Sequence, residues 1–301
     1  MRIASLLPSA TEIICRLGLG DQLVGVSHEC DYPSVRTLPG LTSSAIPKDA
    51  PSREIDRLVR EHLQTHDALY LLDLELLEKL RPDLIVSQAL CDVCAVSSDD
   101  VEAAVHAFAN APSVINLEPS RLEDVFRTIE HVGEAAGASR IAENLVRQLR
   151  ERVEVVKART AELRELPKVV FLEWIDPPFN AGHWTPELIR LAGGIGCLGS
   201  PGAPSRTLDW AEVVAAQPDI LVAACCGYDV ARATQDLETL QGKPGWNGLP
   251  CVKSKRVFVL DGNAYFNRPG PRLVDSLELL ANKLHPNAHP LPPPVGVGPV
   301  R

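Results

Sequence analysis

Two pairs of cysteines in this sequence have the chemistry to bind a metal ion or to exchange electrons. Cys91 and Cys94 are separated by two residues, whereas Cys225 and Cys226 are adjacent. The first spacing fits a thioredoxin-like redox pair, half of a zinc site, or two reduced thiols that line a pocket. An adjacent pair chelates poorly, so other side chains would have to complete a set of four ligands. The candidates for that role are His28, Cys30 and His183.

Aromatic residues form a second candidate site, in a chain that is only 5% aromatic. Five of them lie near expected strand ends or in loops: Trp174, Trp184, Tyr228, Tyr265 and Phe266. Such rings offer a large contact area to a flat ligand, and they can equally pack a core. Arg268 and Arg272 flank a Pro-Gly-Pro sequence, and Arg272 opens an expected helix, where the helix dipole disfavours a cation. A ligand anion or a carboxylate is therefore expected beside these arginines.

The elements that must position these residues alternate between strand and helix in both halves of the chain. Short apolar runs predict strands at 3–7, 23–27, 84–87, 114–117, 169–174, 220–224 and 256–260. Helices are expected at 53–65, 74–80, 98–109, 122–136, 185–192, 208–216 and 272–284, and residues 39–51 are expected to form a long loop. Strand–helix alternation implies parallel sheets, whose ligands bind beyond the carboxyl ends of the strands. The candidate residues gather just after those strand ends, as a binding cleft would require.

The first helix is expected to start directly after the first strand. Ser9 and Glu12 have the spacing of a capping box, which predicts Ser9 as the N-cap residue. The free N–H groups of the first turn would then point at whatever occupies the mouth of the turn. Ser9 and Thr11 are therefore candidates for contact with polar groups of a ligand.

A long helix is expected over Ser139 to Leu166, between two α/β halves. Its apolar residues recur at helical spacing: Ile141, Leu145, Leu149, Val153 and Val156. Such a helix would span roughly 40 Å, which suits a strut between two lobes, although a helix packed along one domain would show the same pattern. The segments 77–88 and 213–224 also echo each other, since both read as a helix end, Pro-Asp and a buried strand.

The predicted fold class is α/β, with two Rossmann-like lobes, each a mostly parallel sheet flanked by helices, joined by one long backbone helix. The expected divisions are an N-terminal lobe at 1–138, the connecting helix at 139–166, a C-terminal lobe at 167–285, and a mobile tail rich in Pro and Gly at 286–301.

The amino-acid composition limits the kinds of partner that the chain can bind and the cellular compartment in which it is expected. The net charge of −9 without a basic block argues against nucleic acid, and no apolar run is long enough to span a membrane. The start of the chain lacks the pattern of a signal peptide, so a cytoplasmic location with reduced thiols is expected, and a periplasmic one only if a leader was removed. The chain is expected to be a monomer.

Segments spread over nearly the whole chain resemble one family. They are RIASLLPSATEIICRLGLGDQLVGVSHECDYP, LEKLRPDLIVSQ, the long central helix, VVAAQPDILVAA and KSKRVFVLDGNAYFNRPGPRLVDSLELLA. This pattern resembles the helical-backbone (class III) substrate-binding proteins that serve vitamin B12, haem and iron-siderophore ABC transporters. The opening SLLPSATE is most similar to the cobalamin-binding branch.

The resemblance implies a non-enzymatic binding protein for cobalamin or a related corrinoid or tetrapyrrole, held in a cleft between two lobes. The implied ligand contacts are Ser9, Thr11, His28, Gln88, Trp174, His183, Trp184, Tyr228, Tyr265, Phe266 and Arg268. His28 or His183 could bind the metal ion of the ligand. The resemblance also implies docking on an ABC transporter permease through one acidic residue per lobe, for which the candidates are Asp99 or Asp100 and Asp209 or Glu212.

Two alternatives stay open at this stage. The chain could handle a bare metal ion, such as zinc or iron, or an Fe–S unit. Its ligands would then come from Cys91, Cys94, His28, Cys30, Cys225 and Cys226. It could instead be a thiol-redox or cobalamin-processing enzyme, although no nucleophile and base stand at a telling spacing.

Overall fold

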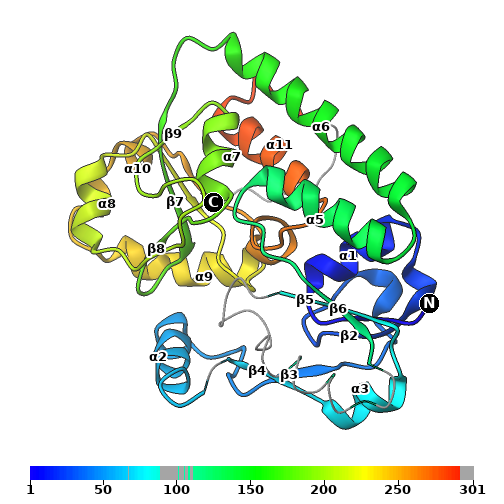
Figure 1. Cartoon of the computed structure of the whole chain (residues 1–301). Coiled ribbons are helices and arrows are strands. Elements are labelled where there is room, and N and C mark those ends of the chain that lie inside the picture. The colour runs from blue at the N-terminus through cyan, green and yellow to red at the C-terminus, as the bar shows by residue number, and fades with distance from the viewer. Residues whose placement is uncertain (67, 89–100, 102–104, 106–107, 109–110, 292–301) are drawn as a thin grey trace. The chain divides into compact units, whose positions relative to one another are not determined.

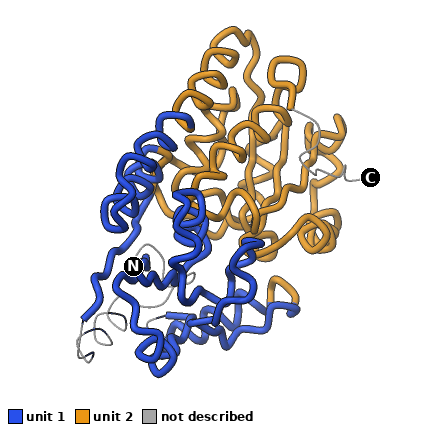
Figure 2. The backbone as a smooth tube through the Cα atoms, turned by 90° about the vertical axis from the view of Figure 1, so that its right-hand side faces the viewer, with its two compact units in different colours: residues 1–50, 54–119, 123–148 blue, residues 51–53, 120–122, 149–301 orange. Residues whose placement is uncertain are grey.

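The computed structural model describes the chain except residues 67, 89–100, 102–104, 106–107, 109–110 and 292–301. The chain divides into two compact units, one formed by residues 1–50, 54–119 and 123–148 and the other by 51–53, 120–122 and 149–301 (Figure 2). We call them unit 1 and unit 2. Each unit has its own sheet flanked by helices, which confirms the predicted α/β class, while the expected limits of the lobes stay a prediction.

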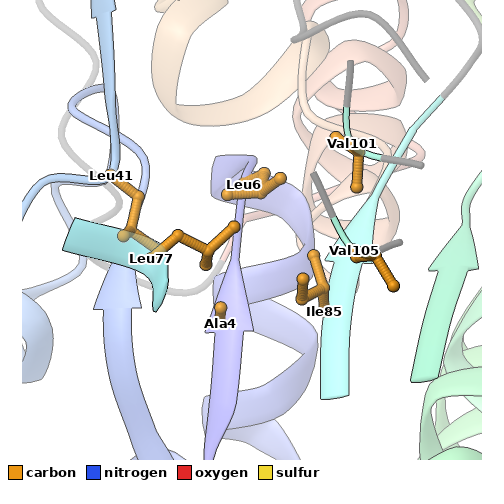
Figure 3. Close-up of a cluster of buried hydrophobic side chains, with 7 residues drawn as sticks. All are labelled: Ala4, Leu6, Leu41, Leu77, Ile85, Val101 and Val105. Atoms are coloured by element: carbon orange, nitrogen blue, oxygen red, sulfur yellow. The ribbon is translucent and has the colours of Figure 1, made fainter. Parts of the chain in front are cut away.

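Unit 1 contains a four-stranded parallel sheet in the order β2-β1-β5-β6 (Figure 1). Its strands are β1 (Ile3–Ser5), β2 (Leu23–Val26), β5 (Leu84–Ser87) and β6 (Ser113–Asn116). Its helices include α1 (Pro8–Arg16), α3 (Leu74–Leu80) and all but the first residues of α2 (Ser52–His62) and α5 (Leu122–Ala135). Apolar side chains from the strands and from neighbouring segments form one buried cluster, shown in Figure 3: Ala4, Leu6, Leu41, Leu77, Ile85, Val101 and Val105. This core fixes the sheet whose strand ends carry the candidate residues.

A second, small sheet in unit 1 was not expected from the sequence. Strand β3 (Thr42–Ser44) pairs antiparallel with β4 (Tyr70–Leu72), so the prediction of one long loop at 39–51 is wrong. β3 reads Thr-Ser-Ser and carries no apolar alternation to reveal a strand. It matters because it places Thr42 beside the end of β2.

Unit 2 contains a sheet in the order β11-β10-β7-β8, with β9 paired to β7, and only β8 runs antiparallel. The strands are β7 (Lys168–Trp174), β8 (Phe179–Asn180), β9 (Ile195–Gly196), β10 (Ile220–Ala223) and β11 (Val257–Val259). The helices are α7 (Thr185–Leu191), α8 (Trp210–Ala216), α9 (Val230–Gln241), α10 (Pro250–Lys253) and α11 (Leu273–Leu284). Helix α9 was not expected, and α7 and α11 pack against each other (Figure 1).

The long helix exists as α6 (Ser139–Ala161), a single helix whose first ten residues belong to unit 1 and the rest to unit 2. Its predicted apolar positions are buried except Ile141, which is 50% exposed. The helix ends five residues before the expected Leu166, because Glu162 and Leu163 already donate to carbonyls only three residues back. Within unit 2, Arg152 of α6 binds Asp275 and Glu278 of α11.

The internal echo between the two halves is confirmed in detail. Helices α3 and α8 each end at a residue with positive φ, Arg81 at 47° and Gln217 at 43°, and Pro-Asp and a buried strand follow. The aspartate of each echo accepts a hydrogen bond from the backbone of the neighbouring strand region. Asp83 accepts from the N–H of Arg2 at 2.7 Å, and Asp219 from that of Lys168 at 2.8 Å.

The remaining expectations concern the chain's membrane character and its last residues. No helix in the described part of the chain is long and apolar enough to cross a membrane. The predicted helix at 98–109 falls largely outside the described residues. The predicted mobile tail begins too early, since His289 is only 3% exposed and its carbonyl accepts from Asn282 Nδ2 at 2.8 Å. Residues 292–301 lie outside the described part.

Candidate functional site

The turn that opens α1 differs from the prediction. Leu7 is the N-cap residue and Pro8 the first helical residue, so Ser9 does not cap the helix. Proline at this position is preorganised for a helix start, which explains why no side-chain cap is needed. Ser9 is 3% exposed and Thr11 is fully buried. Contact of these two residues with a ligand stays a prediction. Their burial makes such contact less favourable.

The hydroxyl of Thr11 belongs to a buried chain of hydrogen bonds in unit 1. Thr11 Oγ1 donates to Ser5 Oγ at 2.8 Å, and Ser5 Oγ donates to the carbonyl of Leu7 at 3.0 Å. Cys30 Sγ lies 3.1 Å from Thr11 Oγ1. Because the single hydroxyl proton of Thr11 is already donated, the Cys30 thiol is the donor in this contact. The Cys30 side chain therefore takes part in the internal hydrogen bonding of unit 1.

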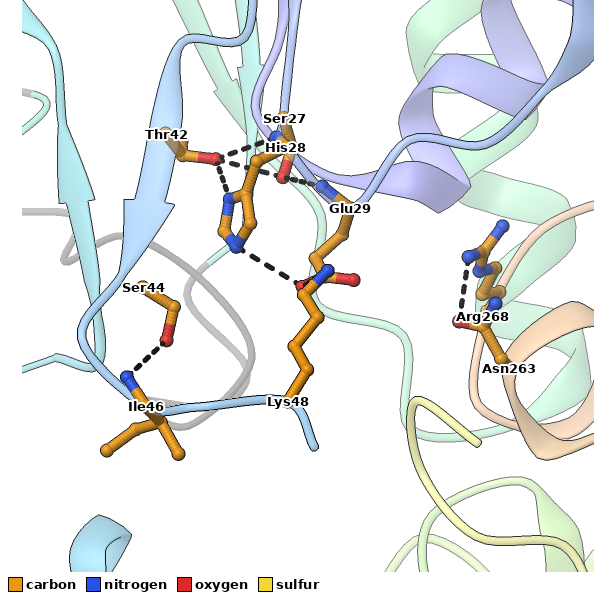
Figure 4. A network of polar contacts seen from close by, with 9 residues as sticks. All are labelled: Ser27, His28, Glu29, Thr42, Ser44, Ile46, Lys48, Asn263 and Arg268. Atoms are coloured by element: carbon orange, nitrogen blue, oxygen red, sulfur yellow. Dashed lines mark hydrogen bonds and ion pairs between the residues drawn. The ribbon is translucent and has the colours of Figure 1, made fainter. Parts of the chain in front are cut away.

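His28 follows β2 and forms the polar network in unit 1 shown in Figure 4. Its Nδ1 lies 2.6 Å from Thr42 Oγ1, which donates to Ser27 Oγ at 3.0 Å. Its Nε2 lies 3.2 Å from a carboxylate oxygen of Glu29, and Lys48 contacts the same oxygen at 2.8 Å. Both ring nitrogens of His28 thus have polar neighbours within unit 1, and the ring packs edge-on against Tyr70, with 4.8 Å between centroids.

Glu29 is held as a carboxylate by this network. Its burial alone would raise the pKa, but hydrogen bonds with His28 and Lys48 outweigh burial and lower the pKa of Glu29 to about 2. Neither Glu29 nor Thr42 was singled out from the sequence. A polar loop that follows a strand is a usable signal for Glu29, whereas Thr42 was hidden by the missed strand β3.

The end of β5 leads into the segment with the first cysteine pair. Gln88 follows Ser87 and is 6% exposed. Cys91 and Cys94, with the candidate docking residues Asp99 and Asp100, lie outside the described residues. Their predicted roles therefore stay predictions.

In unit 2, an aromatic pair stands at the carboxyl ends of β7 and β10. Trp174 ends β7, and its ring lies 4.9 Å from that of Tyr228 at an interplanar angle of 44°. Arg232, on the first turn of α9, places its guanidinium 4.9 Å from the Tyr228 ring. The indole N–H of Trp174 is buried without a hydrogen-bond acceptor in the described part of the chain. A buried donor left in this state costs about 1–3 kcal/mol.

Two other predicted aromatic contacts belong to the core of unit 2. Trp184 is 7% exposed and its Nε1 donates to the carbonyl of Phe266 at 2.8 Å. Phe266 is 1% exposed and packs on Phe171, with 5.1 Å between ring centroids. Their predicted contact with a ligand stays a prediction, and their burial does not favour it.

Past β11, a π-helical turn, η4 (Gly262–Phe266), carries Asn263 and Tyr265. A Cβ at Gly262 would lie 2.1 Å from the carbonyl oxygen of Cys225, so only glycine permits this approach of the β10 and β11 ends. Asn263 Oδ1 accepts from Arg268 at 2.8 Å, as Figure 4 shows. Arg268 is 6% exposed, and burial raises the pKa of the half-buried Tyr265.

We refer to these strand-end segments of unit 2, around Trp174, Cys225–Tyr228 and Asn263–Arg268, as the unit 2 rim. Backbone hydrogen bonds join them. Cys226 donates to the carbonyl of Glu173 at 3.1 Å, and Asn263 donates to that of Tyr228 at 3.1 Å. Burial raises the pKa of the Glu173 carboxyl. Sequence reasoning missed Glu173 and Arg232, although Glu173 precedes Trp174 at the end of a predicted strand.

The second cysteine pair splits into two environments. Cys225 is fully buried, which raises the pKa of its thiol, whereas Cys226 is exposed. In the described part of the chain, no group of three or more His, Cys, Asp and Glu side chains could hold a metal ion. The predicted set of cysteine ligands stays untested, because two of its members lie outside that part.

His183 precedes α7 in a left-handed conformation, with φ at 50°. Burial lowers the pKa of its imidazole, which favours the neutral form that binds metals. Its ring lies 5.6 Å from that of Trp184. The structure therefore permits His183 as a ligand for a metal ion and leaves that role a prediction.

Comparison with known proteins identifies the family. The family described as periplasmic binding protein matches residues 3–264. This chain belongs to that family. It is similar to an ABC transporter substrate-binding lipoprotein of Bacillus subtilis, with 25% identity over 95% of this chain and 80% of the relative. It is also 22% identical to the vitamin B12-binding protein of Vibrio cholerae, over 94% of this chain and 88% of that protein.

Solved structures share the fold. The periplasmic haem-binding protein RhuT of Roseiflexus sp. RS-1 in its apo form aligns with a TM-score of 0.72 at 25% identity, covering 96% of this chain and 99% of that one. The periplasmic vitamin B12-binding protein BtuF of Vibrio cholerae aligns with a TM-score of 0.68 at 21% identity, covering 96% and 98%. The family is therefore one of substrate-binding proteins related to ABC transporters, and its relatives differ in the ligand that they are named for.

The family assignment bears on two expectations, the cellular location of the chain and its docking on a permease. The names of the relatives are periplasmic or lipoprotein, and they give no support to the expected cytoplasmic location. Of the docking candidates in the described residues, Glu212 accepts from the backbone of Asp209 at 2.9 Å and binds Arg206 at 2.6 Å. Both residues therefore already serve the start of α8, and docking stays a prediction.

Proposed function

We propose that this chain is the substrate-binding protein of an ABC transporter for a corrinoid, with cobalamin as the first candidate and haem as the alternative tetrapyrrole. The observation that carries the proposal is the partly exposed ring of Trp174 in the unit 2 rim, which packs against the buried ring of Tyr228. Aromatic faces at the carboxyl ends of parallel strands suit a large, flat, partly apolar ligand. The relatives named for vitamin B12 and for haem support the same ligand class.

The rim also offers polar groups that suit the periphery of such a ligand. The indole N–H of Trp174 is a donor without an acceptor in the described residues, and a ligand amide or carboxylate would supply one. Tyr265 and Asn263 lie on the neighbouring π-helical turn, and such turns occur frequently at functional sites. Among the predicted contacts, Trp174 and Tyr265 are therefore those that we propose for the ligand, since both are partly exposed, whereas Tyr228 and Arg268 are each only 6% exposed.

We further propose a periplasmic or lipid-anchored setting and no catalytic role. The location follows that of the relatives, which are named as periplasmic proteins or as a lipoprotein. In unit 1, the side chains of His28 and Lys48 contact the carboxylate of Glu29. We propose that these contacts hold the loop after β2 in place and do not form a reaction centre.

Equilibrium dialysis against three ligands tests the proposal. Cyanocobalamin, dicyanocobinamide and haemin are each offered at micromolar concentration, and the bound ligand is measured by its absorbance. We expect saturable binding of one corrinoid per chain. Equal affinity for cobinamide would show that the corrin ring, and not the nucleotide base of cobalamin, is recognised.

Two results would change the conclusion. Binding of haemin alone would replace the corrinoid by haem within the same ligand class. No binding of any of the three would overturn the tetrapyrrole proposal while leaving the family assignment intact.

A further inference from the structure

A pair of histidines stands at the end of α2, a helix that Figure 1 labels. His62 is the last residue of the helix, and His66 follows four residues later in the turn that continues it. Their rings are stacked, with 4.1 Å between centroids and an interplanar angle of 10°. Neither ring takes part in the network around His28.

Hydrogen bonds settle which nitrogen of His66 carries the proton. Thr65 Oγ1 donates to the carbonyl of His62 at 3.3 Å, so its oxygen is left to accept from His66 Nδ1 at 2.9 Å. His66 Nδ1 also lies 3.3 Å from the same carbonyl, which can only accept. Nδ1 is therefore protonated and Nε2 carries the lone pair. Histidines that bind metals are commonly oriented in this way, by an N–H donated to a backbone carbonyl.

His62 provides the second nitrogen. Its Nε2 is buried and has no hydrogen-bond partner in the described part of the chain. The preceding turns of α2 do not compete for it, because Arg57 is paired with Glu54 and Glu61, and Arg60 with Asp56. The carboxyl end of a helix carries partial negative charge, which favours a bound cation.

We propose that His62 and His66 form a two-ligand site for a divalent ion of the late first-row transition metals, such as Ni²⁺, Cu²⁺ or Zn²⁺. Neutral imidazole suits these ions, and the spacing of four residues places both side chains on the same face of the helical turn. A metal ion lies in the plane of each ring that binds it, so the stacked rings must splay apart. His66 is exposed and can turn, and water completes the coordination.

A second histidine pair with the same spacing shows why spacing alone is insufficient. His285 and His289 follow α11, but their ring centroids are 6.5 Å apart. His285 Nε2 lies 2.9 Å from the carbonyl of Gly193, and His289 Nε2 lies 3.3 Å from Thr160 Oγ1. The Nε2 atoms of this pair are occupied in packing unit 2, and we propose no site there.

Titration of the full chain with Ni²⁺ tests the site. Ni²⁺ is paramagnetic and does not oxidise thiols, so imidazole NMR signals report which histidines it approaches while calorimetry gives the affinity. His66→Asn removes one ligand at an exposed position. His131→Asn, on α5, is the matched control, since His131 is also exposed and its ring stacks on no other histidine in the described part of the chain.

We expect the signals of His62 and His66 to broaden first at substoichiometric Ni²⁺ in the wild type and in His131→Asn. His66→Asn should bind this ion on the order of a hundredfold more weakly, the gain that joining two weak ligands provides. Wild-type affinity in His66→Asn would overturn the proposal. So would first broadening at any other histidine of the wild-type chain, a result that does not depend on the folding of a variant.

Discussion

The sheets of the two units are alike where their strands begin and differ where they end. At the start, each unit uses the same device, a left-handed residue, Pro-Asp and a buried strand, with Asp83 and Asp219 bonded to the backbone of the neighbouring strand region. At the end, unit 1 carries the charged network of His28, Glu29 and Lys48, whereas the unit 2 rim carries Trp174 and Tyr228. A shared scaffold thus supports one polar and one aromatic surface.

This difference separates what stabilises each unit from what can bind a ligand. The polar groups around His28 bond mainly to one another, although His28 Nε2 has only the ion-pair contact with Glu29 and Ser87 Oγ has no hydrogen-bond partner in the described residues. The unit 2 rim contains tightly joined backbone but leaves a partly exposed tryptophan whose buried indole N–H has no acceptor in the described residues. The rim of unit 2 is therefore the better place to look for ligand contacts that can be removed without unfolding the chain.

The largest effect is expected from Gly262→Ala, which tests whether the rim of unit 2 is fixed by its backbone. The added Cβ would lie 2.1 Å from the Cys225 carbonyl oxygen and 2.6 Å from the Ala224 carbonyl carbon, and neither backbone atom can turn away. We expect a loss of about 3 kcal/mol or more in the free energy of unfolding, measured by urea denaturation. Gly248→Ala is the control, because its Cβ would meet no atom within 4 Å. Equal stability of the two variants would show that the backbone of the unit 2 rim can shift to accommodate the added Cβ at little cost in stability.

A smaller effect is expected from Glu29→Gln, which probes the charged network of unit 1. The folded pKa of about 2 lies below the ordinary value of 4.5, so the carboxylate stabilises the fold above pH 4.5 and this contribution is lost as the pH falls towards 2. We expect a loss on the order of 2 kcal/mol at pH 7, since each unit of pKa shift equals about 1.4 kcal/mol and Glu29 is partly exposed.

The measurement for Glu29→Gln is the free energy of unfolding as a function of pH. The wild type should lose stability between pH 5 and pH 2 more steeply than the variant, and the two curves should converge at low pH. Glu165→Gln, at an exposed position, is the control and should follow the wild type. Parallel curves for wild type and Glu29→Gln would show that the network does not hold Glu29 ionised.

The sequence predicted the scaffold better than the site. Apolar runs located β1, β2, β5, β7, β10 and β11, because buried parallel strands need such runs, and the Pro-Asp echo located their shared starts. The pattern failed for the polar strand β3, for the two-residue strands β8 and β9, and for helix α9. The short strands are set by pairing with β7, which no local pattern records.

The site shows the same limit at the level of single residues. Trp174 and Trp184 look equivalent in the sequence, since Trp174 ends the predicted strand at 169–174 and Trp184 follows in the segment after it. Only the fold reveals that Trp184 donates to Phe266, 82 residues away, while the ring of Trp174 packs at a tilt against that of Tyr228. The direction in which a ring points depends on backbone that is distant in the sequence. The spacing of the aromatic residues could therefore identify them as candidates, but it could not show which of them lie in the core.

The most direct test of the proposed site is the affinity for cyanocobalamin of two tryptophan variants. Trp174→Ala removes the aromatic face at the rim. Trp210→Ala is its match in the same unit, a half-buried tryptophan whose ring lies 6.1 Å from that of Trp246, in α8 and away from the strand ends. We predict that Trp174→Ala raises the dissociation constant about thirtyfold, the effect of losing roughly 2 kcal/mol of contact, while Trp210→Ala binds as the wild type does. Wild-type affinity in Trp174→Ala, or equal loss in both variants, would contradict the account.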